Sequence, residues 1–97
     1  MKTVRLATQV ADFVSKLAPV PKRRVRAAFR ALAHERGDIK PLAPPLDGYC
    51  RLRIGGYRVV FAYADRNTIE SIFIEQRSVV YDLLVSAIED ALITRER

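Results

Sequence analysis

The sequence is poor in the side chains that build metal centres and disulfides. It contains one cysteine, Cys50, one histidine, His34, and no tryptophan. A single cysteine excludes an intramolecular disulfide, and one thiol with one imidazole cannot assemble a metal cluster of Cys and His ligands. No apolar run reaches the roughly 18 residues that a membrane-spanning helix needs. We therefore expect no metal, no cofactor and no membrane partner.

The N-terminal residues also lack the apolar stretch of a secretion signal, which favours a cytoplasmic protein. With 97 residues and 49% hydrophobic content, the chain fits a single globular domain over residues 1–97. A domain of this size buries only about 60–65% of the surface of its unfolded chain, so a deep enzyme cleft is not expected.

Positive charge is in excess. The chain has 17 basic and 11 acidic residues, for a formal net charge of +6, and 13 of the basic residues are arginine. Because guanidinium groups are permanently charged and bind phosphate with two hydrogen bonds, an arginine-rich domain favours a polyanionic partner such as a nucleic acid. The alternative is that the charge serves only solubility.

Two amphipathic stretches near the N-terminus predict a helical hairpin. Thr8 is a suitable N-cap for the first helix, which ends at Pro19. Pro21 fits the first turn of the second helix, and Gly37 fits its end. Residues 37–48 hold three prolines and no periodicity, so we expect an extended connection over the surface.

Alternation of polar and apolar residues predicts the strands. Residues 2–6 form the first, with Val4 and Leu6 facing the core, and later strands follow at 49–54, 57–63 and 68–77. Gly55-Gly56 is a two-residue hairpin turn, and Arg66-Asn67 forms the next turn.

Ser78 caps a last predicted helix that runs to about Thr94. The predicted order is an N-terminal strand, a two-helix hairpin, a three-stranded antiparallel meander and a C-terminal helix, which is an α+β fold. We expect the helices to cover one face of the sheet and to leave the other face open to solvent.

The Gly55-Gly56 turn fixes which side chains share a face. It places Arg53 opposite Arg58 and Arg51 opposite Val60, so the three arginines point to one side, where we expect them to be solvent-facing. The next turn places Glu75 opposite Arg58, which puts Arg77 on the arginine side as well. Cys50 falls on the other side as a small apolar residue.

Like charges directly opposite each other destabilise a sheet, so a compensating function is expected. The functional interpretation is a phosphate site whose guanidinium groups neutralise a phosphodiester backbone and its transition-state charge. The alternative is a solvated face on which Glu70 and Glu75 pair locally with arginines.

A second basic group lies on the second predicted helix and could contact an RNA backbone: Lys22, Arg23, Arg24, Arg26 and Arg30. The alternative is an ordinary solvated helix face. His34, near the end of that helix, is interpreted as a partner of the helix dipole rather than a catalytic base.

Two segments carry a family resemblance. Residues 46–61 read LDGYCRLRIGGYRVVF, and residues 75–81 read EQRSVVY. These segments and the predicted element order resemble the RelE/ParE toxin superfamily of bacterial type II toxin–antitoxin systems. The resemblance implies a RelE-like fold and a cytoplasmic toxin that cleaves mRNA on the ribosome. It also implies a cognate antitoxin protein as partner, alongside ribosome and mRNA.

The same resemblance implies a catalytic set. Arg51 and Arg53 fall where RelE-type nucleases have two strand lysines, Arg58 matches the arginine of the GYR motif, Arg77 matches the last-strand arginine, and Tyr81 matches the tyrosine that follows it. The implied reaction needs no metal: the 2′-hydroxyl attacks the adjacent phosphate and leaves a cyclic phosphate and a 5′-hydroxyl.

This sequence departs from the family pattern at the proton acceptor. Arginine does not deprotonate at working pH, so Arg51 and Arg53 can bind phosphate but are poor general bases. Gln76 stands where many relatives have histidine, and Glu75 is the nearest carboxylate. The general base is therefore unassigned.

Two alternatives to the nuclease follow. One is a ParE-like toxin that inhibits DNA gyrase, against which the group Arg58, Arg77 and Tyr81 argues, since gyrase binding needs no phosphate-facing arginines. The other is a catalytically weak relic that still binds RNA or an antitoxin, and the arginines at the two lysine positions favour it.

Overall fold

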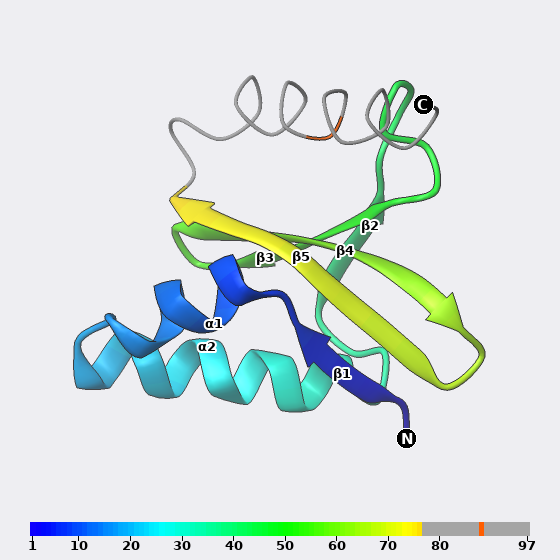
Figure 1. The fold of residues 1–97 in the computed structure, drawn as a ribbon. Coiled ribbons are helices and arrows are strands. Elements are labelled where there is room, and N and C mark those ends of the chain that lie inside the picture. Colours follow the sequence, from blue (N-terminus) through cyan, green and yellow to red (C-terminus); the bar gives the residue numbers. More distant parts are fainter. Residues whose placement is uncertain (77–87, 89–97) are drawn as a thin grey trace.

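Five strands and two helices make up the fold in the computed structural model, which describes residues 1–76 and Ile88 (Figure 1). The elements are β1 (Thr3–Leu6), α1 (Thr8–Ser15), α2 (Pro19–Leu32), β2 (Asp38–Pro41), β3 (Cys50–Ile54), β4 (Tyr57–Asp65) and β5 (Thr68–Gln76). The α+β class and the antiparallel meander that the sequence predicts are confirmed.

The strands form one sheet in the order β1-β5-β4-β3-β2. The pair β1·β5 is parallel and the other pairs are antiparallel, and the two helices connect β1 to β2 at the opposite edge of the sheet. The N-terminal strand therefore lies at one edge of the sheet, and β2 lies at the other.

The helices α1 and α2 lie together on one face of this sheet (Figure 1). Their apolar positions recur every three or four residues, which turns one stripe of each helix toward the strands. The buried core on this side consists of Val10, Val14, Val25, Phe29 and Leu32 from the helices and Leu52, Ile54, Val59, Phe61, Ile69 and Ile74 from the strands. Cys50 is partly buried against the same core, as predicted.

The second face of the sheet is only partly open. Leu46, Val60 and Ile88 are buried together there, with Tyr49 and Phe73 packed against them. The expectation of a face left entirely to solvent is therefore wrong. Its physical reason is that Val60 and Phe73 are apolar side chains that lie directly opposite each other on that face, so they need cover.

The connection predicted for residues 37–48 contains a strand that the sequence did not indicate. Residues Asp38–Pro41 pair with β3 and form the outer edge of the sheet as β2. The prediction for Leu6 is also wrong: it lies at the end of β1 and is 40% exposed. At an edge with only one neighbouring strand, the last side chain has little to pack against.

The helix ends differ from the prediction by a few residues. Thr8 is the first residue of α1 and the cap is Ala7, while Pro19 begins α2 at its first position instead of ending α1. The helix α2 ends at Leu32, before Gly37, and Glu35 takes the left-handed backbone at φ 56° that glycine usually supplies.

The predicted helix from Ser78 to Thr94 lies outside the described residues except for Ile88, which is helical. Neither α1 nor α2 has the length and apolar content that would let it span a bilayer.

Candidate functional site

The turn at Gly55-Gly56 sets the register of the arginines. Gly55 adopts φ +55°, a conformation that a glycine accepts without strain and that a two-residue hairpin turn requires. Arg53 is then the direct partner of Arg58, and Arg51 is the partner of Val60. The predicted register of this hairpin is confirmed at every pair.

Cross-strand pairing extends this arrangement into two rows of side chains on one face, which we call the arginine face. The first row runs across four strands as Asp38, Arg53, Arg58 and Glu75. The second row runs as Lys40, Arg51, Val60 and Phe73. The two facing arginines of the first row are thus flanked by a carboxylate on each side.

Arg51 forms an ion pair and is largely enclosed by the protein. Its side chain is 19% exposed, and its Nη1 lies 3.5 Å from Oδ1 of Asp38. Asp38 is the direct partner of Arg53, so its carboxylate reaches diagonally to the neighbouring arginine. That Nη1 atom is buried and has no hydrogen bond within the described residues, so the pair is held by charge alone.

Arg58 is half-buried rather than solvent-facing, which corrects the expectation from the sequence. Its Nε atom is buried and finds no hydrogen-bond acceptor in residues 1–76 or Ile88. A buried donor without an acceptor costs free energy, because it has lost its hydrogen bonds to water. An anionic acceptor that binds this edge of the guanidinium would therefore be stabilised.

Glu75 lies opposite Arg58, as predicted, but its carboxylate turns elsewhere. One oxygen accepts the backbone N–H of Gln76 at 3.0 Å. Glu75 and Arg58, both among the described residues, form no ion pair within 4.0 Å. Among the described residues, no carboxylate therefore forms an ion pair with Arg53 or Arg58.

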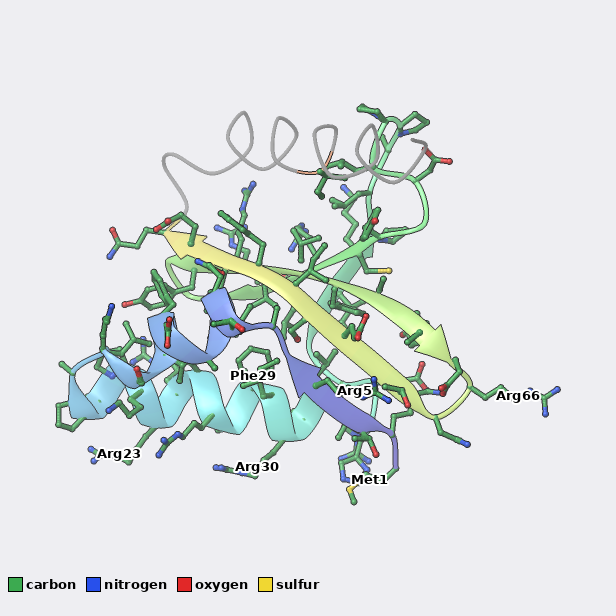
Figure 2. The ribbon with its side chains drawn as sticks, viewed as in Figure 1. Met1, Arg5, Arg23, Phe29, Arg30 and Arg66 are labelled. Carbon is green, nitrogen blue, oxygen red and sulfur yellow. The ribbon has the colours of Figure 1, made fainter. Side chains whose placement is uncertain are left out.

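The second predicted group lies on the opposite side of the molecule. The helix α2 packs on the face of the sheet opposite the arginine face. Figure 2 shows that Arg23 and Arg30 point away from the sheet. Arg23, Arg24, Arg26 and Arg30 are exposed and Lys22 is half-buried. The structure therefore does not bring the helix arginines together with Arg51, Arg53 and Arg58.

Arg24 differs from the rest of the helix group. A Cβ atom placed on Gly55 would lie 3.7 Å from its Nη1, so Arg24 reaches the turn of the β3–β4 hairpin. This position at the rim of the sheet was not predicted from the sequence.

The structure also locates two other residues considered in the sequence, His34 and Cys50. His34 is exposed in the turn after α2. Burial raises the pKa of the Cys50 thiol, which fits an apolar role. Over the described part of the chain, no group of three His, Cys, Asp or Glu side chains could hold a metal ion. Arg77 and Tyr81 lie outside the described residues.

The sequence reasoning missed Asp38. Residues 38–40 alternate an acidic, an apolar and a basic side chain, but this pattern is too short to predict a strand without the partner β3.

Comparison with known proteins places the fold. No protein-family model and no curated protein matches the sequence. Among solved structures, the chain is similar to the toxin–antitoxin complex RelBE2 from Mycobacterium tuberculosis, with 26% identity, a TM-score of 0.61 and coverage of 78% of this chain and 98% of that chain.

Two further structures agree. The RelB-RelE antitoxin–toxin complex from Methanococcus jannaschii matches with 18% identity, a TM-score of 0.63 and coverage of 81% and 96%. The YoeB/ParE toxin from Agrobacterium tumefaciens matches with 21% identity, a TM-score of 0.55 and coverage of 78% and 98%. The predicted resemblance is therefore confirmed, and this chain has the fold of the RelE/ParE toxin superfamily.

Proposed function

We propose that this protein is the toxin of a type II toxin–antitoxin system and that it inhibits translation as a ribosome-dependent, metal-independent mRNA endonuclease. The observation that carries the proposal is the direct pairing of Arg53 with Arg58, next to Arg51, on one face of the sheet. The similarity to RelE-type and YoeB/ParE structures supports the toxin assignment.

The chemistry follows from the charge of the reacting phosphate. When a 2′-hydroxyl attacks the adjacent phosphodiester, the phosphorus passes through a five-coordinate state with more negative charge on its oxygens. Preset guanidinium groups stabilise that charge more than the charge of the ground state. Arg58, with an unsatisfied buried Nε, and Arg53 opposite it are suited to this role. Arg77 and Tyr81 are proposed to complete the set.

Proton removal from the 2′-hydroxyl needs a different group. A guanidinium group has donors and no acceptor, and Glu75 already accepts a backbone hydrogen bond. The proposal therefore assigns the arginines to electrostatic stabilisation and assigns no general base to this chain. Groups of the ribosome would supply that function.

The proposed partners follow from charge. An acidic antitoxin segment is expected to neutralise a chain of net charge +6. Arg23, Arg26 and Arg30 are exposed on α2, and Figure 2 shows Arg23 and Arg30 pointing away from the sheet. These helix arginines are proposed to contact RNA backbone without reading its sequence.

The test is induced expression in bacteria, with mRNA ends mapped by primer extension. Wild type is compared with Arg58→Gln and with the matched control Arg5→Gln, which removes an exposed arginine on β1 that pairs with Glu70. New ends confined to translated codons, present in wild type and Arg5→Gln and lost in Arg58→Gln, are the expected result.

Other outcomes decide between the alternatives. Growth arrest with intact mRNA would overturn the nuclease and favour a ParE-like gyrase inhibitor, which a DNA supercoiling assay would then test. Absence of arrest would favour a relic that binds RNA or an antitoxin without cleaving.

A further inference from the structure

Asp38 is the one acidic side chain of the described residues that forms an ion pair within the two rows that hold Arg51, Arg53 and Arg58. It lies on the edge strand β2, directly opposite Arg53, and its Oδ1 is 3.5 Å from Nη1 of Arg51. The other carboxylate of its row, Glu75, is engaged with the backbone of Gln76. Asp38 is therefore the internal counter-charge of the cluster.

The surroundings of Arg51 call for such a counter-charge. Its side chain is 19% exposed, its β2 partner is the cation Lys40, and its Nη1 has no hydrogen bond within the described chain. A guanidinium with so little water around it is stabilised by a nearby anion. Removing that anion without a replacement leaves the charge uncompensated.

The Asp38 carboxylate is nevertheless easily exchanged. It is 57% exposed, and at 3.5 Å with no hydrogen bond it holds Arg51 only through charge. Half-exposed ion pairs of this kind are weak, because water and salt screen them. A phosphate oxygen can offer Arg51 the same charge together with a proper hydrogen bond.

We infer that Asp38 is a built-in competitor of RNA, a carboxylate that occupies the anion position on Arg51 until a backbone phosphate displaces it. This inference rests on the proposed function only in requiring that the arginine face binds RNA phosphate. It does not require cleavage. Asp38 is thus a residue that sets affinity, not a catalytic residue.

The displacement has a measurable signature in salt. When phosphate takes its place, the freed Asp38 carboxylate attracts a cation from solution, which offsets one of the counterions that RNA releases. Asp38→Asn keeps the size of the side chain and removes this effect. We expect Asp38→Asn to bind single-stranded RNA about three- to tenfold more tightly at low salt. The slope of log affinity against log salt should steepen by up to about 0.7.

The experiment measures fluorescence anisotropy of a short 2′-O-methyl RNA, which cannot be cleaved, over a series of salt concentrations. The matched control is Glu70→Gln, which removes the same charge from the exposed Arg5–Glu70 pair, whose oxygen and nitrogen are 3.8 Å apart at the far edge of the sheet. Both variants change the net charge equally, so only a local effect separates them.

Two further proteins complete the design. Arg51→Gln and the double variant Asp38→Asn/Arg51→Gln form a double-mutant cycle, in which the gain from Asp38→Asn should vanish when Arg51 is absent. Asp38→Ser serves if melting curves show that Asp38→Asn is not folded.

The inference is overturned if Asp38→Asn and Glu70→Gln bind alike, if Asp38→Asn binds more weakly than wild type, or if its gain persists without Arg51. Absence of RNA binding by every protein would also overturn it. Tighter binding by Asp38→Asn without any mRNA cleavage in cells would support the inference while refuting the nuclease, so the two can fail separately.

Discussion

The side-chain amide of Gln9 hydrogen-bonds both backbone groups of Ile74. Its Nε2 donates to the Ile74 carbonyl at 2.8 Å, and the Ile74 N–H donates to its Oε1 at 3.0 Å. The strand β1 pairs with β5 only as far as Leu6 and Ser71. Gln9 therefore takes the place of a strand where β1 has ended, and it covers the β5 edge next to Glu75.

Replacing Gln9 should destabilise the fold. Gln9→Ala leaves a part-buried N–H and C=O without partners, so we expect a loss of about 1–3 kcal/mol in the free energy of unfolding. Gln9→Glu keeps the acceptor but removes the donor, so its loss should be intermediate. Urea denaturation measures both, with Thr8→Ala on the exposed side of the same turn as control. Equal stability of Gln9→Ala and wild type would contradict the role of Gln9.

The sequence predicted the part of the site that depends on one turn. Once Gly55-Gly56 is recognised, the period of two along each strand dictates that Arg53 faces Arg58. The register of the next hairpin, β4·β5, could not be read from its turn alone. Two register shifts interrupt β4·β5, one between Tyr63 and Asp65 and one between Val60 and Phe61, and they cancel, so Arg58 still meets Glu75.

The parts that the sequence did not predict depend on contacts between distant segments. The strand β2 has four residues and one apolar side chain, Ile39, so its own pattern is too short to stand out, and pairing with β3 defines it. The burial of Val60 depends on Leu46 and Ile88, which are far away along the chain. The link between Asp38 and Arg51 exists only through the same pairing.

Gly37→Ala should be strongly destabilising. Gly37 has φ +134°, and a Cβ there would lie 2.8 Å from Cδ1 of the buried Leu52. Backbone strain and overpacking together should cost about 2–4 kcal/mol in the free energy of unfolding. Gly48→Ala is the matched control, because Gly48 has φ +93° with open space around it and carries only the strain. A thermal melt that ranks the two variants equally would show that the Leu52 contact is unimportant.

Tyr63 should make the fold less stable at high pH. Burial, followed by its hydrogen bond to Glu35 at 3.0 Å and the charge of that carboxylate, raises the pKa of the Tyr63 hydroxyl above the ordinary 10.0. The folded state thus holds this proton more tightly than the unfolded state. The stabilisation is complete below pH 10.0 and is lost as pH rises through the folded-state pKa.

The check compares wild type with Tyr63→Phe by urea denaturation on both sides of pH 10.0. Other tyrosines and lysines also titrate there, so the decisive quantity is the difference between the two proteins. The wild-type advantage should shrink as pH rises. A difference that stays constant with pH would show that the proton on Tyr63 does not contribute.

Arg53→Gln should separate stability from function. Arg53 faces Arg58 directly, and like charges in that position destabilise a sheet, so removing one should raise the free energy of unfolding by about 0.2–1 kcal/mol. The same change should lower mRNA cleavage about 100-fold or more, as expected for a lost charge stabiliser. Chemical denaturation and primer extension on the same protein test both halves, with Arg5→Gln as control. A less stable Arg53→Gln would mean that the attraction between Arg53 and its cross-strand neighbour Asp38 outweighs the repulsion between Arg53 and Arg58.

The helix arginines should affect RNA affinity without changing where RNA is cut. Arg23, Arg26 and Arg30 are exposed on α2, and Arg23 and Arg30 point away from the sheet, so they can contact phosphates but cannot reach a phosphate held on the arginine face (Figure 2). Changing all three to Gln should reduce the salt slope of single-stranded RNA binding by about 2. The pattern of mRNA ends should stay the same, because contacts to the backbone position RNA without reading its bases. A matched triple change at Lys16, Arg36 and Arg66 removes the same charge from other exposed positions, and an equal loss of affinity there would show that net charge, not this helix, binds RNA.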